Sequence, residues 1–293
     1  RQMCIRDRAW GGHFGFHADL PRHAFQVGAD ALITSTHKAL PGYSASALLL
    51  ARTTLLSAER LEQSFETTHT TSPAGAPLAS IDGVRALLET RGEELIGNLL
   101  NNIHRFKEMV QAEFALPIFL YPSDFPAGRF DPSKIVLRVQ QLGASGVEIE
   151  QDLQAKGIRV EMADRDTIVF LATIADTEAD FDSLADALIP ILKKRQEQRR
   201  ESATALSWSV VPQRATSMRD AYFAETEMVS AANAVGRISA DLIAPYPPGV
   251  AVVAPGEVLT KQIVEGLSAS RAAGVRIAYA TDSTLNSYRV VIR

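Results

Sequence analysis

Two short apolar segments near the start of the chain most constrain its fold. Residues 29–34 and 45–51 are dominated by apolar side chains and lack the regular polar alternation of a strand with one face in water. Strands that are buried on both faces have this pattern in the parallel or mixed sheets of α/β proteins. We therefore predict that both segments are buried strands and that the chain belongs to the α/β class.

Helical spacing of apolar residues dominates the region that follows. From residue 80 to residue 110 the pattern predicts one long helix, which is long enough to leave one domain and enter another. Short segments then predict a small α+β unit, and residues 202–208 are typical of a linker. We predict helices at 20–27, 147–155, 178–194, 228–243 and 259–272, and strands at 158–162, 168–172 and 250–254.

Composition and charge exclude several classes of protein. The 293 residues include 30 Lys and Arg and 34 Asp and Glu, a net charge of −4, so the basic balance of a nucleic-acid-binding domain is missing. The apolar runs are far shorter than the ~20 residues that span a bilayer. The single cysteine, Cys4, rules out an intramolecular disulfide and fits a reducing compartment. We predict a cytoplasmic globular protein with no nucleic-acid or membrane partner.

Phosphate-loop and metal motifs are absent or incomplete. Neither the Walker spacing nor a G-x-G-x-x-G motif occurs. His13 and His17 are four residues apart, but Gly15 between them disfavours a helix and no glutamate follows His13. We therefore predict no metal site.

The first eight residues do not continue the pattern of the rest. They show neither strand alternation nor a helical stripe, and they carry three arginines. We interpret them as a foreign or misread junction, and the chain as truncated at its N-terminus. A short disordered tail is the alternative interpretation.

The tetrapeptide Ser35-Thr36-His37-Lys38 directly follows the first predicted strand. Ligands of α/β proteins bind at this end of a strand, and loss of water around a lysine there favours the neutral amine, which can attack a carbonyl. Ser35 and His37 offer hydrogen-bond donors to an anion, and Asp7, on the strand expected upstream, offers an acid. This combination suits pyridoxal phosphate. A surface lysine that caps a loop explains Lys38 equally well.

Motifs spread along the chain resemble the Orn/Lys/Arg decarboxylase family, pyridoxal-phosphate enzymes of the aspartate-aminotransferase-like fold. The S-x-H-K motif alone is only moderately specific, because cysteine desulfurases of the same fold carry a similar one. Joined with the Y-P-P-G and P-G-E motifs of the tail, it is specific, and the resemblance covers all but the first eight residues. The matching segments are Asp7-Arg8-Ala9-Trp10-Gly11-Gly12-His13-Phe14-Gly15-Phe16-His17, Gly28-Ala29-Asp30, Ser35-Thr36-His37-Lys38, Thr71-Ser72-Pro73, Ala79-Ser80-Ile81-Asp82, Gly157-Ile158-Arg159-Val160-Glu161-Met162, Pro245-Tyr246-Pro247-Pro248-Gly249 and Pro255-Gly256-Glu257.

The resemblance implies a fold, a reaction and an assembly. Residues 1–112 would be the C-terminal remnant of the large domain of a fold-type I pyridoxal-phosphate enzyme, with the connecting helix. Residues 113–201 would form a small α+β domain, and residues 202–293 the family's α+β C-terminal domain. The implied reaction decarboxylates arginine, lysine or ornithine to a polyamine or its precursor. The implied assembly is a homodimer or a higher homo-oligomer.

The resemblance also assigns roles to individual residues. Lys38 would form the Schiff base with pyridoxal 5'-phosphate, and Ser35 and His37 would contact its phosphate. His37 is in addition a candidate for proton transfer. Asp7 would pair with the pyridine nitrogen, and Ala9 would lie beside the ring.

Glu257 is a further candidate, for the distal cation of the substrate. A structural role is equally well supported, because carboxylates are favourable just before a helix and one is predicted from residue 259.

Two departures from the family pattern leave alternatives open. Arg8 stands where the family usually has an acidic or small residue. Only 37 residues precede Lys38, too few for the family's phosphate-binding turn and ring-stacking histidine, so exposed strand edges are expected. One alternative is a catalytically silent fragment or pseudo-enzyme of this family. Another is a fold-type I aminotransferase or desulfurase, although a desulfurase needs a cysteine after the lysine and this chain has none.

Overall fold

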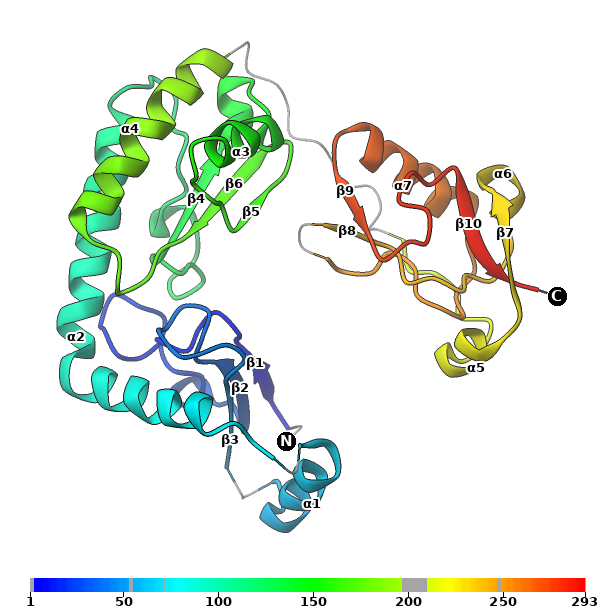
Figure 1. The fold of residues 1–293 in the computed structure, drawn as a ribbon, viewed down its shortest axis with the longest axis horizontal. Helices are drawn as coiled ribbons and strands as arrows, with labels where there is room; N and C mark the ends of the chain where they lie inside the picture. Colours follow the sequence, from blue (N-terminus) through cyan, green and yellow to red (C-terminus); the bar gives the residue numbers. More distant parts are fainter. Residues whose placement is uncertain (1–2, 53–54, 71, 197–209, 247–248, 293) are drawn as a thin grey trace. The chain divides into compact units, whose positions relative to one another are not determined.

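Figure 1 shows the elements of the computed structural model, which describes residues 3–52, 55–70, 72–196, 210–246 and 249–292. The chain forms two units, one of residues 1–136 with 170–189, the other of residues 137–169 with 190–293. The three-domain division at residues 112 and 201 stays a prediction. The linker predicted at residues 202–208 lies outside the described residues.

A mixed three-stranded sheet begins the first unit, in the order β1 (Ile5–Asp7), β2 (Ala31–Ser35) and β3 (Ala47–Ala51). β1 runs parallel to β2, and β3 runs antiparallel to it, so both predicted strands are confirmed. β1 confirms the strand expected upstream at Asp7, although residues 1–8 show no strand alternation. Three residues are too few to show alternation, and the hydrogen bonds to β2 define this strand instead.

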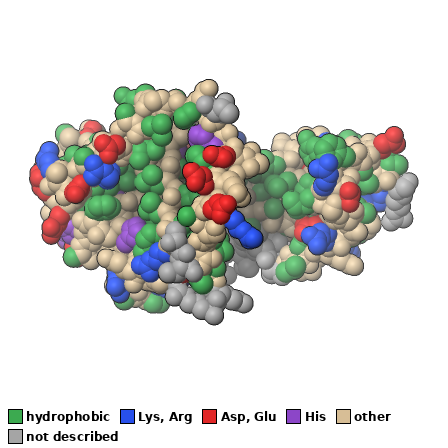
Figure 2. Space-filling model, turned by 90° about the horizontal axis from the view of Figure 1, so that it is seen from below, with side chains coloured by type: hydrophobic (Ala, Val, Ile, Leu, Met, Phe, Trp, Pro, Cys, Tyr) green, Lys and Arg blue, Asp and Glu red, His purple; other side chains and the backbone are tan. Residues whose placement is uncertain are grey.

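The predicted burial of both strands on two faces is wrong, because β3 has no buried residue and β2 is exposed at Ile33. Leu32 of β2 is buried, but Ile33 is 43% exposed and Leu49 of β3 is 49% exposed. Ile33 and Leu49 are paired in register, so they share one face of the sheet. Among the described residues nothing covers these two side chains fully. Other hydrophobic side chains are exposed on the face that Figure 2 shows.

α2 (Gly75–Gln111) confirms the predicted long helix and begins somewhat earlier. Its buried residues Val84, Leu88 and Ile96 form a cluster with Leu20 and Leu40. Figure 1 shows α2 bending part-way along its length, with the sheet of β1, β2 and β3 on the inner side of the bend. α2 thus supplies the apolar surface against which the segments around the sheet pack.

Two shorter segments near the sheet differ from prediction. The helix predicted at 20–27 is reduced to the 3-10 turn η1 (Ala24–Val27), which ends at Gly28 in the left-handed conformation. α1 (Ala58–Thr68) is an additional helix in which no residue is buried. Its large apolar residues Leu61 and Phe65 are four positions apart, a helical spacing that the sequence analysis did not single out.

The second half of α2 packs through Phe106, which is fully buried. Its ring lies 6.0 Å from that of Phe119 and 6.0 Å from that of Phe181. Phe181 belongs to α4 (Glu178–Arg195), which confirms the helix predicted at 178–194. Beside this core, Arg105 of α2 pairs with Asp182 of α4 at 2.8 Å.

A second three-stranded sheet has the order β4 (Lys134–Arg138), β6 (Thr167–Leu171) and β5 (Met162–Ala163). α3 (Gly146–Gln154) precedes β5 and confirms the helix predicted at 147–155. β6 confirms the strand predicted at 168–172. The strand predicted at 158–162 is wrong except at its end, because pairing with β6 begins only at Met162.

The C-terminal part of the second unit contains two antiparallel pairs. β7 (Thr226–Ser230) pairs with β10 (Ser287–Val291), and β8 (Ala244–Tyr246) pairs with β9 (Arg276–Ala278). α5 (Met218–Phe223) precedes β7, and α7 (Lys261–Ala272) confirms the helix predicted at 259–272. Across the described ranges, no helix combines the length and apolar character that crossing a membrane requires.

Two predictions for this part are wrong. The helix predicted at 228–243 begins inside β7, and only α6 (Ala231–Ala234) is helical. The strand predicted at 250–254 is reduced to a single bridge between Ile243 and Val253. Both segments owe their structure to partners distant in sequence, such as β10, and local periodicity does not reveal these partners.

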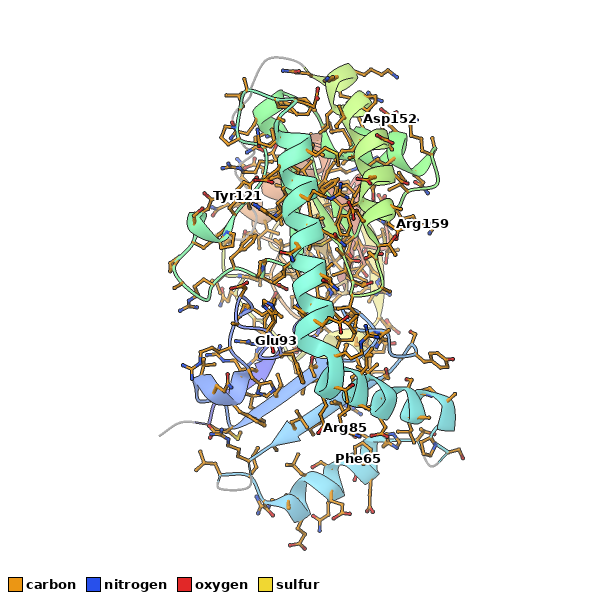
Figure 3. All side chains as sticks on the ribbon, turned by 90° about the vertical axis from the view of Figure 1, so that its left-hand side faces the viewer. Phe65, Arg85, Glu93, Tyr121, Asp152 and Arg159 are labelled. Carbon is orange, nitrogen blue, oxygen red and sulfur yellow. The ribbon has the colours of Figure 1, made fainter. Side chains whose placement is uncertain are left out.

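Lys107 is a buried cation on α2, with 3% of its surface exposed. Its Nζ donates a hydrogen bond to the carbonyl of Leu120 at 3.1 Å and lies 5.2 Å from the ring centroid of Tyr121. Figure 3 shows Tyr121 beside α2. Burial lowers the pKa of Lys107 to about 8, against the opposing charge of Asp124.

We expect the pKa of Lys107 to make the first unit more stable at alkaline pH. Between about pH 8 and pH 10.5 the unfolded chain keeps a proton that folded Lys107 has released, so the free energy of unfolding rises with pH. From pH 7.5 to pH 9.5 the rise should be about 2 kcal/mol larger than in a Lys107→Met variant. Urea unfolding followed by Trp10 fluorescence, in a Trp208→Phe background, measures it. Equal pH dependence in the two proteins would contradict the assignment.

Candidate active site

Asp7 and the segment that leads to Lys38 lie at the same edge of the first sheet. Asp7 ends β1 and pairs with Ile33 of the parallel strand β2, which ends at Ser35, shortly before Lys38. The carboxyl ends of parallel strands meet at one edge, and α/β proteins bind ligands there. The turn after β1 is held on β2, because the Arg8 N–H donates to the carbonyl of Ile33 at 2.9 Å.

A cavity of about 660 Å³ lies at this edge. Three of the residues to which the family resemblance assigns cofactor roles, Asp7, Ala9 and Lys38, line it together. A loop of residues 128–131 forms the opposite part of its lining. The lining residues are Asp7, Arg8, Ala9, Trp10, Gly11, Phe14, Pro21, Lys38, Gly128, Arg129, Phe130 and Asp131.

Ser35 and His37 are not among the residues that line the cavity. Both side chains are half-buried, and His37 Nδ1 lies 2.7 Å from the carbonyl oxygen and 3.1 Å from the amide nitrogen of Ser46. His37 Nε2 has no hydrogen-bond partner among the described residues. Lys38 is exposed, so the described residues do not supply the loss of water that the sequence argument assumed.

The cavity carries charges of both signs. Lys38, Arg8 and Arg129 contribute cations, and Asp7 and Asp131 contribute carboxylates. The Arg8 guanidinium donates to the carbonyl of Arg22 at 3.3 Å and lies 5.2 Å from the ring centroid of Phe14. Burial, with the charge of Arg6, lowers the pKa of Arg8. Three cations in the lining favour ligands with a carboxylate or a phosphate.

A buried polar cluster adjoins the cavity, which we call the Asp131 cluster: His13, Asp131, Ser133 and Lys134. Lys134 Nζ donates to Ser133 Oγ at 2.9 Å and lies 3.1 Å from Asp131 Oδ2. Ser133 Oγ donates to Asp131 Oδ1 at 2.7 Å. His13 is 2% exposed, and its Nε2 lies 3.0 Å from Ser133 Oγ.

The environment of Asp131 favours its charged form. Burial by itself would raise the pKa of this carboxyl group, but His13, whose Nε2 lies 3.7 Å from Asp131 Oδ1, and the positive charge of Lys134 outweigh it. Together with the Ser133 hydroxyl they hold the pKa well below its ordinary value. Asp131 therefore faces the cavity as a carboxylate.

The sequence analysis did not single out the loop of residues 128–131 or the Asp131 cluster. The sequence did contain an indication of an ion pair, because Asp131 and Lys134 are three residues apart and Lys134 begins the apolar strand β4. Charged residues at the start of an apolar strand are commonly exposed, and only the fold shows that these are buried together. His13 is 120 positions from Ser133 in the chain.

The residues around the cavity fit the ring and the carbonyl carbon of pyridoxal phosphate, but not its phosphate. A carboxylate, a lysine without a polar partner among the described residues, and a small alanine line the same space. These are the groups that the ring and the carbonyl carbon of the cofactor require. For the phosphate, Ser35 and His37 adjoin the cavity in sequence but do not line it.

Glu257 belongs to the second unit. Its Oε2 accepts a hydrogen bond from the Ala254 N–H at 2.8 Å, so its carboxylate closes the turn of residues 254–257. α7 begins at Lys261 with its N-cap at Thr260, so Glu257 is not the helix cap. Its assignment to the substrate cation stays a prediction.

We expect the pairing of Asp131 with Lys134 to stabilise the first unit through mutual neutralisation. Asp131→Asn and Lys134→Met each leave one buried group without its partner, and each should lower the free energy of unfolding by about 3 kcal/mol. The double variant should lose much less than the sum, because no unpaired charge remains. Urea unfolding of the four proteins measures this coupling. Additive losses would show that the two side chains act independently.

Two family profiles match the amino-acid sequence. The Orn/Lys/Arg decarboxylase major domain matches residues 2–123, and the Orn/Lys/Arg decarboxylase C-terminal domain matches residues 196–277. The first match begins at residue 2, so the expectation that the resemblance excludes the first eight residues is wrong.

A curated relative and two solved structures are similar over nearly the whole chain. The arginine decarboxylase of Bacillus subtilis is 32% identical over 292 residues, which are 97% of this chain and 59% of that protein. Lysine decarboxylase A from Pseudomonas aeruginosa has a TM-score of 0.79 at 18% identity, covering 99% of this chain and 53% of its own. The constitutive lysine decarboxylase of Escherichia coli has a TM-score of 0.74 at 20% identity, covering 99% of this chain and 54% of its own.

These similarities have different weight. At 18% and 20% identity the two structures support the fold alone, which agrees with the predicted fold-type I architecture. The chain spans less than two thirds of the length of the Bacillus subtilis relative. The two profiles match both ends of the chain, and together they cover well over half of it. The chain belongs to the Orn/Lys/Arg decarboxylase family.

Proposed function

We propose that this protein decarboxylates a basic amino acid, arginine, lysine or ornithine, with pyridoxal 5'-phosphate held at Lys38. The main support for the proposal is that Asp7, Ala9 and Lys38 line the same cavity. The names of similar proteins, arginine decarboxylase and lysine decarboxylase, support this substrate class. The product would be a polyamine or its precursor.

Each residue of the cavity has a separate task in this proposal. Pyridoxal phosphate, when bound, supplies an electron sink for the electron pair that remains on Cα after carbon dioxide leaves. Lys38 holds the cofactor through Nζ and can carry a proton to and from the substrate at that atom. Asp7 keeps a proton on the ring nitrogen through its carboxylate. Ala9, with its small side chain, leaves room for the ring.

Ser35 and His37 are proposed to bind the cofactor phosphate. His37 Nδ1 is held by the Ser46 backbone, so Nε2 is the ring nitrogen that can meet an anion or exchange a proton. Neither side chain lines the cavity. This proposal therefore requires side-chain rotation or a local movement of the segment between β2 and Lys38.

A catalytically silent member of the family is the alternative. Lys38 is exposed and the two proposed phosphate ligands do not line the cavity, and both observations favour this alternative. The homodimer and the cytoplasmic location that the family resemblance implies remain proposals as well. Sedimentation equilibrium of the purified chain tests the dimer, and a mass of one chain at micromolar concentration would contradict it.

We expect pyridoxal phosphate to react selectively with Lys38. The purified chain is incubated with the cofactor, reduced with borohydride and mapped by peptide mass spectrometry. Most of the label should be on the peptide that contains Lys38, because this lysine lines a cavity together with Asp7 and Ala9. A Lys38→Ala variant should lose this label, whereas Lys156→Ala, which removes an exposed lysine after α3, should keep it.

Two outcomes would contradict the proposal. Label spread evenly over exposed lysines would favour the catalytically silent alternative. If Lys38 is labelled but no carbon dioxide is released from arginine, lysine or ornithine, the cofactor assignment stands and the proposed reaction is wrong.

A further inference from the structure

The lining of the cavity comes largely from two segments that are far apart in the sequence. Asp7, Arg8, Ala9, Trp10, Gly11 and Phe14 form one wall, and Gly128, Arg129, Phe130 and Asp131 form the other. The first wall is tied to the sheet through β1 and through the Arg8 N–H. The second wall is a loop without regular structure between Phe125 and β4. Its distance from Lys38 therefore depends on side-chain contacts.

One of these contacts links the two walls directly. His13 lies between Gly11 and Phe14 of the first wall in the chain, and Ser133 follows the second wall. His13 Nε2 lies 3.0 Å from Ser133 Oγ, and both residues are buried. On the other side of the loop, Lys107 lies 5.7 Å from the ring centroid of Phe130. That contact ties the loop to α2, whereas His13 ties it to the wall that contains Asp7.

The hydrogen-bond pattern defines which atom donates in the contact between the walls. Ser133 has one hydroxyl proton, which it donates to Asp131 Oδ1. Ser133 Oγ also accepts from Lys134 Nζ. His13 Nε2 must therefore be the donor, since no second proton is available on Ser133. His13 Nδ1 is buried without a partner among the described residues, so Nε2 makes the polar contact of this ring.

We propose that His13 is a positioning residue for the cavity, which holds the loop of residues 128–131 at a fixed distance from Lys38 through Nε2–H and Ser133 Oγ. This inference rests on the proposed function, because it assumes that the cavity receives the cofactor and the substrate. His13 acts through Ser133 and Asp131. It does not line the cavity and is not a catalytic residue.

Three substitutions separate this role from simple packing. Glutamine places an amide N–H near the position of imidazole Nε2, so His13→Gln keeps the donor. His13→Leu fills similar space without a donor. Ser133→Ala removes the acceptor and leaves His13 in place. His17→Leu is the matched control, because His17 lies in the same segment and is half-buried, and its Nδ1 accepts from the nearby Asp19 N–H at 3.2 Å.

Amide hydrogen exchange of the loop is the first measurement, and it requires no cofactor. The Lys134 N–H donates to the carbonyl of Asp131 at 3.1 Å, and the Ser133 N–H donates to Asp131 Oδ1 at 3.0 Å. We expect exchange of these two amides to become about tenfold faster in His13→Leu and Ser133→Ala. In His13→Gln and His17→Leu it should stay close to that of the wild-type chain.

Labelling of Lys38 by pyridoxal phosphate and borohydride is the second measurement. The ratio of label on Lys38 to label on the exposed lysines should fall about tenfold in His13→Leu, and His13→Gln should restore it. A residue with only a packing role would not show this rescue, because leucine fills the space as well as glutamine does. Circular dichroism establishes that each variant is folded. If His13→Leu does not fold, Ser133→Ala and His13→Gln carry the comparison.

The outcomes distinguish the inference from the proposed function. Absence of selective Lys38 label in the wild-type chain contradicts the proposed function, and with it the positioning role. Selective label in the wild type that is unchanged in His13→Leu and Ser133→Ala overturns the inference and leaves the proposed function intact. Unchanged exchange at residues 133 and 134 overturns the inference as well, because the contact then does not hold the loop.

Discussion

The parallel pairing of β1 with β2 is the interaction on which the candidate site depends. It brings Asp7 to the edge at which β2 ends, three residues before Lys38. The turn that follows β1 approaches β2 closely, since a Cβ at Gly12 would lie 2.9 Å from the carbonyl oxygen of Ser35. A side chain at this position would push the turn away from the strand. The short strand and the glycine turn thus act together to form one wall of the cavity.

Buried charges constrain the opposite wall. Lys107, Lys134 and Asp131 are largely removed from water, so each needs specific partners to offset the cost of burial. Lys107 donates to the carbonyl of Leu120 and lies near the rings of Tyr121 and Phe130. Lys134 pairs with Asp131 and donates to Ser133. These requirements are satisfied in few conformations of the segment between Leu120 and β4. The loop of residues 128–131 is thereby given a defined position in the lining of the cavity.

Local patterns predicted the long elements well and the paired short ones poorly. α2, α4 and α7 have an apolar stripe over many turns, so the periodicity is visible without knowledge of the fold. β1 and β7 have no such signal, because hydrogen bonds to distant partners define them. At the site, Asp7, Ala9 and Lys38 follow from motif and position. The loop of residues 128–131 and His13 do not, because the burial of their polar groups is a tertiary property.

The sequence by itself determined the α/β class and the family and singled out Lys38 as the lysine proposed to hold the cofactor, because short motifs and helical periodicity are local properties of the chain. Only the tertiary structure decided which of the candidate residues share a cavity. It brought Asp7, Ala9 and Lys38 together, left Ser35 and His37 outside the lining, and placed the Asp131 cluster beside them. The physical reason is that strand pairing and the contacts of buried polar groups join segments that are separated in the sequence, such as β1 with β2 and His13 with Ser133.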